Sequence, residues 1–279
     1  GWRVFDWESM EEGIRVSSLM SSFVAASGHA TPARAAASKQ VGVLYNQTIL
    51  KMGQGDLDGA LDSIAQTRRL SPPNAIVAQL EMLEGSILLG QEKQEDALLH
   101  LDAALALQAD LPLAHHLRGQ AFSALGKYED CIREQLEYLR MLGDDSDAYL
   151  ELGAAYESLE KRTDAMEAYR KGVECGEKDF DNRFGLARLL LEDGKVDEAT
   201  KLFLESCGNA PEPTSYVEEA ARLLYDADAA QAVLDLCAGR PDGVAVLYYR
   251  GYALSRLGRY AEAEPALLAG VALKSQAWE

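Results

Sequence analysis

Residues 117–128 read LRGQAFSALGKY, and residues 249–260 read YRGYALSRLGRY. Both stretches have glycine as their third residue, a second glycine seven residues later, and a tyrosine two residues after that. Residues 152–156, LGAAY, begin in a similar way. This recurrence indicates an internal repeat, and a repeat decides the fold class before composition does, because each unit buries its core against its neighbours.

The repeat has a period of 34 residues, which is clearest in its small residues. Two series share this interval, the second twelve residues behind the first: Gly85, Gly119, Gly153, Ala187 and Ala221, then Ala97, Cys131, Ala165 and Ala199. The large apolar residues around them follow the helical period. Each unit is therefore predicted to be two helices, each with one small residue where the backbones approach closely.

A glycine followed by a polar residue separates the two predicted helices in several units. These pairs are Gly55-Asp56, Gly126-Lys127, Gly194-Lys195 and Gly258-Arg259. Glycine readily takes the left-handed conformation that ends a helix. The pattern therefore indicates antiparallel helix pairs, and we expect the sixth unit to lack about four residues in its turn at residues 225–228.

This helix-turn-helix unit resembles the tetratricopeptide repeat. Residues 152–156, and the stretch from Leu202-Phe203 to Pro211, are similar to the L-G-x-x-Y and F-to-P segments of that family. The resemblance implies an all-α fold, an α-solenoid in which antiparallel helix pairs form a right-handed superhelix of about seven repeats. The repeats are expected to start near Val41, Ala78, Pro112, Ser146, Phe180, Thr214 and Val244.

The first forty residues do not follow the period. An amphipathic helix is expected over residues 10–27, because their apolar residues lie on one helical face. Thr31-Pro32 then starts another helix, which runs into the first repeat. We therefore divide the chain into residues 1–40, an N-terminal capping helix region, and residues 41–279, the repeat array. The alternative role for the first segment is docking onto a partner or a second subunit.

Composition and motifs argue against several classes of function. The 279 residues carry 27 Lys and Arg against 45 Asp and Glu, a net charge of -18, which repels nucleic acid. No apolar run approaches the ~18 residues that insert into a membrane. Nucleotide-loop, serine-hydrolase and metalloprotease motifs are missing, and the adjacent His115 and His116 cannot present both rings to one ion. We expect no enzyme activity, no cofactor and no metal site.

The resemblance also implies a concave groove, lined by the first helix of each repeat, that binds a segment of another protein. Carried over to this chain, the groove positions that bracket the small residues are Tyr45, Met82, His116, Gln120, Phe184, Arg188, Arg222, Tyr248 and Tyr252, with Arg256, Glu157 and Glu218 in or near the groove. The three arginines, spaced 34 residues apart, would form a line of donors for carboxylates. The other interpretation is that they are solvated or paired within the chain.

A non-catalytic scaffold that binds a peptide or protein segment is therefore the expected function. Two alternatives stay open: a regulatory or substrate-docking part of a larger enzyme, or an array that self-associates through its termini. The four cysteines are single and widely spaced, which fits a reducing compartment and a cytoplasmic location. Because the chain starts at Gly1 rather than Met, a periplasmic or exported protein is the alternative.

Overall fold

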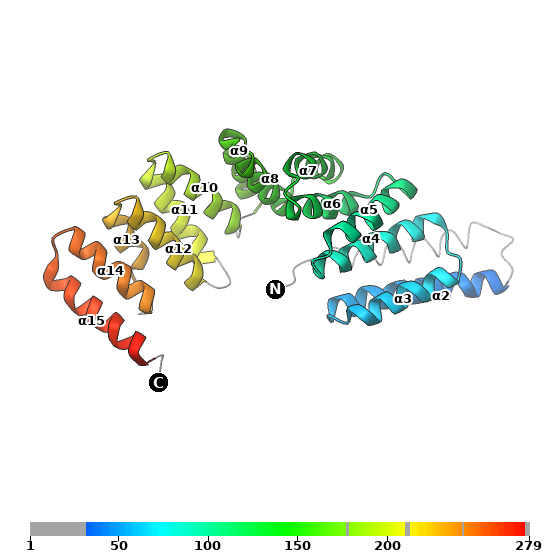
Figure 1. The fold of residues 1–279 in the computed structure, drawn as a ribbon, viewed down its shortest axis with the longest axis horizontal. Helices are drawn as coiled ribbons and strands as arrows, with labels where there is room; N and C mark the ends of the chain where they lie inside the picture. Colours follow the sequence, from blue (N-terminus) through cyan, green and yellow to red (C-terminus); the bar gives the residue numbers. More distant parts are fainter. Residues whose placement is uncertain (1–31, 177–178, 210–212, 242, 277–279) are drawn as a thin grey trace. The chain divides into compact units, whose positions relative to one another are not determined.

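The computed structural model describes residues 32–176, 179–209, 213–241 and 243–276 (Figure 1). These residues form fourteen helices and no strand. In chain order the helices are α2 (Pro32–Gly53), α3 (Leu57–Arg69), α4 (Asn74–Gly90), α5 (Gln94–Leu107), α6 (Pro112–Ala124), α7 (Tyr128–Leu142), α8 (Ser146–Ser158), α9 (Arg162–Cys175), α10 (Asp181–Glu192), α11 (Val196–Asn209), α12 (Pro213–Asp226), α13 (Ala230–Cys237), α14 (Val244–Arg256) and α15 (Tyr260–Gln276). The predicted all-α helical repeat is confirmed, and the helix expected over residues 10–27 lies outside the described residues.

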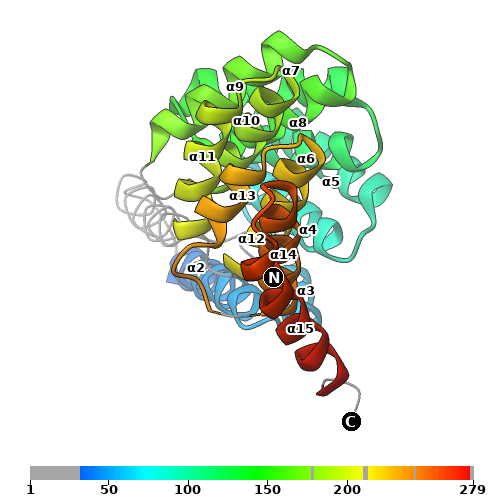
Figure 2. The same cartoon turned by 90° about the vertical axis from the view of Figure 1, so that its left-hand side faces the viewer.

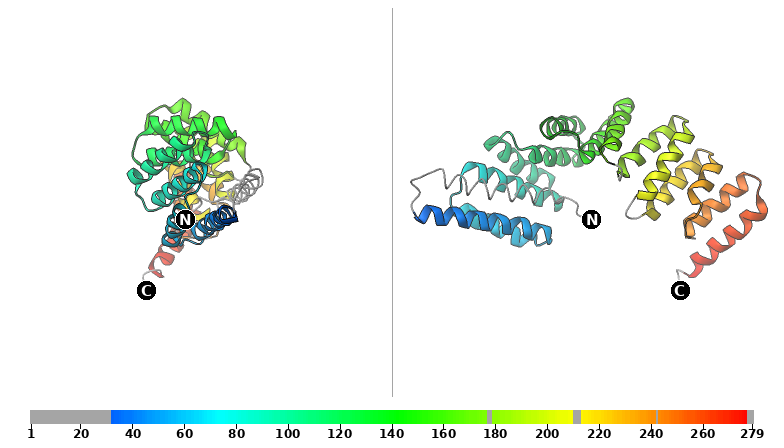
Figure 3. Two further views of the ribbon diagram at one scale, coloured as in Figure 1. Left: turned by 90° about the vertical axis from the view of Figure 1, so that its right-hand side faces the viewer. Right: turned by 180° about the vertical axis from the view of Figure 1, so that it is seen from behind.

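The helices are arranged as consecutive pairs. Figure 1 shows α4 beside α5, α8 beside α9 and α14 beside α15, and Figure 3 shows the same helices from behind. First helices of successive pairs also contact each other, as α8 does with α10 and α12 with α14. We call these first helices, which lie side by side, the first-helix layer.

The chain forms two compact units, Gly1–Met141 and Leu142–Glu279. Each unit has its own apolar core, with Ile64 and Leu80 among the fully buried side chains of the first, and Phe203 among those of the second. The boundary between the units lies inside the repeat array. The expected division after residue 40 stays a prediction.

Small residues lie where the two helices of a pair cross. A Cβ atom added to Gly153 would lie 2.3 Å from Cε1 of Tyr169, and one added to Gly251 would lie 2.5 Å from Cγ of Leu267. The partner lies sixteen positions after the glycine in both pairs, and again in the pairs Gly85 with Leu101 and Gly119 with Gln135. The two helices therefore have the same register in each of these pairs. Glycine makes this close packing possible, because it has no side chain.

The turn inside each of six pairs contains a residue with positive φ, seven positions after the small residue. Gly126, Gly194 and Gly258 have φ of 71°, 74° and 73°, which confirms the predicted glycine turns. The same conformation is taken without glycine by Glu92, Glu160 and Asp228, with φ of 58°, 57° and 59°. This conformation costs a non-glycine residue about 1–2 kcal/mol, so the packing of each pair outweighs the local preference of the turn.

The expected shortening of the sixth unit is wrong in its position. Three residues separate α12, which ends at Asp226, from α13, which begins at Ala230, as three separate α10 from α11. Instead α13 has only eight residues. It is followed by Gly239, with φ of 68°, and by Pro241. Because a left-handed glycine and a proline both end helices, the residues are missing from the end of α13 and not from the turn.

Replacing Gly153 with alanine tests the close approach of α8 and α9. The added methyl group meets the ring of Tyr169, which also lies against Gly185, so it cannot move away freely. We expect the free energy of unfolding to fall by about 1–3 kcal/mol. Gly42→Ala is the matched control, because no atom lies within 4 Å of the added Cβ. Thermal unfolding followed by circular dichroism compares them, and a Gly153→Ala variant as stable as the wild type would contradict this register.

Candidate functional site

Two of the predicted binding residues belong to the core of the first unit. Tyr45 in α2 and Met82 in α4 are both buried. Met82 packs within the apolar core cluster of this unit, together with Leu80 and Leu83. These two side chains therefore offer no surface to a ligand.

His116 and Gln120, on α6, are joined in one hydrogen-bond network. Nε2 of Gln120 lies 3.0 Å from Nε2 of His116, and Nδ1 of His116 lies 2.9 Å from Oε1 of Gln135 on α7. Because the Gln120 amide nitrogen can only donate, the imidazole accepts at Nε2 and donates from Nδ1. The ring also lies against Tyr138, with centroids 4.9 Å apart. Both residues are half-buried, so this part of the first-helix face is polar and already hydrogen-bonded.

Arg188, on α10, is held by a carboxylate of the preceding pair. Its Nη2 donates to Oε1 of Glu157 on α8 at 2.6 Å. The hydroxyl of Tyr169 donates to the same oxygen at 2.5 Å, and burial, together with this hydrogen bond, raises the pKa of Tyr169. Glu192 adds a longer ion pair, at 3.6 Å. Arg188 therefore belongs to a network that joins α8, α9 and α10.

Arg222 and Arg256 are also paired within the chain. Arg222, on α12, forms two hydrogen bonds with Glu219, at 2.5 and 3.0 Å, and these lower the pKa of the Glu219 carboxyl. A third hydrogen bond, at 3.2 Å, joins Arg222 to Asp226. Arg256 on α14 pairs with Asp228. The predicted line of arginines is therefore a series of intramolecular ion pairs, as the second interpretation of the sequence expected.

Phe184 joins the core of the second unit to its first-helix face. Its ring centroid lies 5.0 Å from that of Phe203 on α11 and 5.4 Å from that of Tyr216 on α12, both in edge-to-face contact. The side chain is half-buried. This arrangement holds three successive helices together, because edge-to-face rings contribute attraction beyond their buried area.

The exposed aromatic side chains among the predicted binding residues are two tyrosines of α14. Tyr248 is 48% exposed and Tyr252 is 39% exposed, and their ring centroids lie 4.5 Å apart. A shallow groove of about 510 Å³ lies between α12 and α14 at this point. It is lined by Ser215, Glu218, Glu219, Arg222, Val244, Ala245, Tyr248 and Tyr249. The structure thus brings together Arg222, Glu218 and Tyr248, which the sequence could only place on successive first helices.

Two further tyrosines complete this cluster and were not predicted from the sequence. Tyr249 packs edge-to-face against Tyr248 at 5.2 Å, and Tyr225 of α12 lies 6.0 Å from Tyr252. The guanidinium of Arg256 lies over the ring of Tyr225, 5.3 Å from its centroid. The sequence did contain a signal for Tyr225: it lies three positions after Arg222 and hence on the same face of the helix. We call Tyr225, Tyr248, Tyr249 and Tyr252 the tyrosine cluster.

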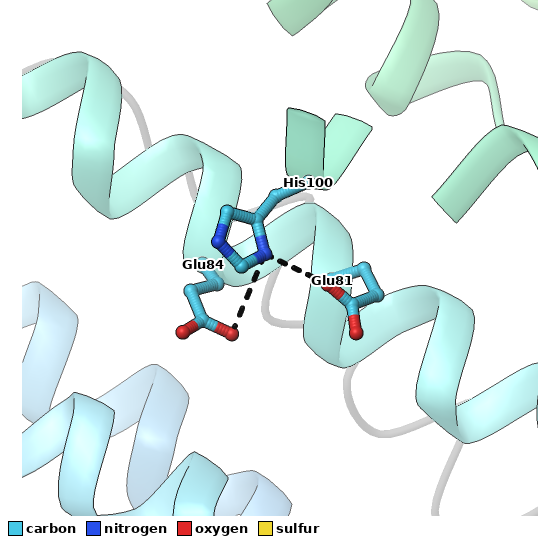
Figure 4. Close-up of side chains that lie close together, drawn as sticks. All are labelled: Glu81, Glu84 and His100. Atoms are coloured by element: carbon cyan, nitrogen blue, oxygen red, sulfur yellow. Dashed lines mark hydrogen bonds and ion pairs between the residues drawn. The ribbon is translucent and has the colours of Figure 1, made fainter. Parts of the chain in front are cut away.

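A separate group of titratable side chains lies in the first unit. Figure 4 shows Glu81 and Glu84 of α4 with His100 of α5, whose Nδ1 is 2.8 Å from Oε2 of Glu81 and 3.7 Å from Oε2 of Glu84. An imidazole with two carboxylates is a donor set that Zn²⁺ accepts. Here, however, Nη2 of Arg68 lies 2.8 Å from Glu81 and 2.5 Å from Glu84. Since Arg68 comes from α3, the group is an ionic link between two helix pairs.

The next repeat of the same unit carries an equivalent ionic link, in which acidic and basic residues have exchanged positions. Oε2 of Glu134 on α7 lies 2.8 Å from Nδ1 of His115 and 2.7 Å from Nη2 of Arg118. Arg118 also pairs with Asp102 of α5 at 2.9 Å. The two groups are equivalent by the 34-residue period. His115, Arg118 and Glu134 lie 34 positions after Glu81, Glu84 and His100, respectively. Both groups therefore bind repeat to repeat.

The two arginine pairings lead to different expected stabilities. Arg188→Ala leaves the half-buried Glu157 without its cation, so we expect a loss of about 1–2 kcal/mol in the free energy of unfolding. Arg222→Ala breaks exposed pairs within one helix and should cost less than about 0.5 kcal/mol. Urea denaturation of the two variants measures the difference. Equal losses would show that the Glu157 network does not stabilise the fold.

No helix among the described residues combines the length and apolar character needed to cross a bilayer. In comparisons with known proteins, residues 146–174 match the family model for the tetratricopeptide repeat. A curated relative, the DnaJ homolog subfamily C member 7 homolog of Schizosaccharomyces pombe, is 28% identical over 109 residues. That alignment covers 39% of this chain and only 23% of the relative.

Solved structures with the same fold cover more of the chain. A tetratricopeptide repeat protein from Parabacteroides merdae has a TM-score of 0.57 at 20% identity, over 84% of this chain and 93% of that one. MamA has a TM-score of 0.52 at 22% identity, over 58% and 93%. A thermophilic tetratricopeptide repeat protein of Thermus thermophilus has a TM-score of 0.51 at 17% identity, over 66% and 99%. With its 34-residue period and its helix pairs, the chain has the fold of the tetratricopeptide repeat proteins, and its residues 146–174 match the model of that repeat.

Proposed function

We propose that this protein is a non-catalytic scaffold that binds a segment of another protein in the groove between α12 and α14. The observation that carries the proposal is the exposure of Tyr248, which lines that groove, and of Tyr252, whose ring lies next to that of Tyr248. Large aromatic rings that stay exposed together are typical of interaction sites, because a partner gains their apolar area at little cost in conformational entropy.

The surroundings of the two rings support a protein segment as the ligand. The groove is shallow rather than enclosed, and it lies between the first helices α12 and α14. Its lining combines aromatic and apolar side chains, such as Tyr248 and Val244, with charged groups, such as Glu218. Protein interfaces combine apolar and polar groups, whereas small molecules favour enclosed pockets.

Selection of peptides tests the proposed function directly. A library of randomised dodecapeptides is selected on the full chain, and the affinity of an enriched peptide is measured by fluorescence anisotropy. We expect the double variant Tyr248→Ala, Tyr252→Ala to bind about tenfold or more weakly, because each ring contributes interface energy. Tyr260→Ala is the control, since Tyr260 is 70% exposed but does not line the groove. Peptides that bind the double variant equally well would refute the proposal.

Self-association is a second candidate function, favoured by the surface of α15. Leu268 is 62% exposed and Val271 is 68% exposed. They are three positions apart on one helix, so their side chains lie on one face. Figure 2 shows α15 in front of the other helices of its unit. We propose that this face joins two copies of the chain.

Charge placed on this face should abolish self-association. We expect the apparent mass from light scattering to rise with protein concentration for the wild type and to stay that of a monomer for the variant Leu268→Glu, Val271→Glu. Leu99→Glu is the matched control, because Leu99 is 69% exposed on α5 and is not part of this face. A wild-type chain that remains monomeric throughout the micromolar range would end this second candidate.

A further inference from the structure

The charges around the groove point to the chemistry of the bound segment. Two carboxylates line the groove, those of Glu218 and Glu219, against the one guanidinium group of Arg222. The groove therefore keeps an excess of one negative charge. It does so on a chain whose net charge is already -18, which favours the approach of cations from solution.

Arg222, the arginine that lines the groove, is already paired with carboxylates of its own helix. Arg222 is bound by Glu219 through two hydrogen bonds and by Asp226 through a third. Both carboxylates belong to the same helix as Arg222, three and four positions away, so their effective concentration is high. A carboxylate on a partner would have to displace them, and it would meet Glu218 in the same groove.

Glu218 is the carboxylate of this groove without an ion-pair partner among the described residues. It is exposed on α12, and it forms no ion pair with any side chain in the described part of the chain, whereas Glu219 is taken by Arg222. The groove that it lines also contains the ring of Tyr248. A cation in the groove can therefore reach a carboxylate and an aromatic ring together.

The tyrosine cluster already accepts one cation from its own chain. Arg256 lies 5.3 Å from the centroid of Tyr225, within the range in which the negative face of a ring attracts a guanidinium group. Tyr248 and Tyr252 belong to the same cluster, and they are exposed where Tyr225 is half-buried. Their rings have the same electrostatic character, and no lysine or arginine of the described residues makes a cation–π contact with them.

From this geometry we propose that the segment bound in the groove is basic. A lysine or arginine of the partner lies on the exposed rings of Tyr248 and Tyr252 and pairs with the carboxylate of Glu218. The inference rests on the proposed function, because it names the chemistry of the same ligand. It reverses the expectation drawn from the sequence, in which the arginine line would bind carboxylates.

The charge of selected peptides gives the first test. The dodecapeptides enriched on the full chain are sequenced, and those that also bind the Tyr248→Ala, Tyr252→Ala variant are discarded, which removes peptides drawn only by the net charge. We expect the remaining set to be richer in lysine and arginine than the input library. A neutral or acidic set would overturn this inference and leave the proposed function standing. No peptide dependent on the tyrosines would overturn both.

Point variants with one enriched peptide give the second test, by fluorescence anisotropy. Glu218→Gln should weaken binding about fivefold, and Tyr248→Leu should weaken it by a similar factor, whereas Tyr248→Phe keeps the ring face and should bind like the wild type. Glu264→Gln removes the same charge from an exposed site on α15 and is the matched control. Equal weakening by Glu218→Gln and Glu264→Gln, or normal binding by Tyr248→Leu, would overturn the inference. Circular dichroism of each variant verifies that it is folded.

Discussion

Two helices can approach closely only where a side chain is missing, and the rest of this structure depends on that constraint. At Gly85 an added Cβ would lie 2.8 Å from Leu101, and at Gly153 the space is filled by the ring of Tyr169, which also reaches Gly185 of the next pair. The small residue thus fixes the register within a pair and helps to set the spacing between pairs. Once the register is fixed, the position after the small residue can differ from repeat to repeat, and it is exposed at Arg222 and Tyr252.

The fold could be predicted from the sequence because its determinants are local and repeated. The small residues and the left-handed turn residues recur at a fixed interval, so each unit supports the assignment of the next. The interval gives the number of missing residues in the sixth unit but not their place. Gly239 and Pro241 carried that information, since both end a helix, whereas the turn at Asp226 to Ala230 has its full length.

The candidate site was less predictable, because repeat spacing assigns a residue to a face but not to a partner or a depth. Tyr45 and Met82 have the spacing of surface positions and are buried. Arg188 and Arg222 occupy equivalent positions one after the small residue, yet one is held by Glu157 from the preceding pair and the other by Glu219 of its own helix. Such pairings depend on side chains that lie outside the period.

The short α13 links the irregularity of the fold to the chemistry of the groove. Because α13 ends early, Gly251 follows Ala221 by 30 positions rather than 34. The position after the small residue, which holds arginine at 188 and 222, therefore holds Tyr252 in the last pair, and Arg256 lies one helical turn further on. There Arg256 packs over Tyr225 and pairs with Asp228, the left-handed residue of the preceding turn. An exposed aromatic ring thus replaces a cation at this position, and the proposed preference of the neighbouring groove for a basic segment depends on this replacement.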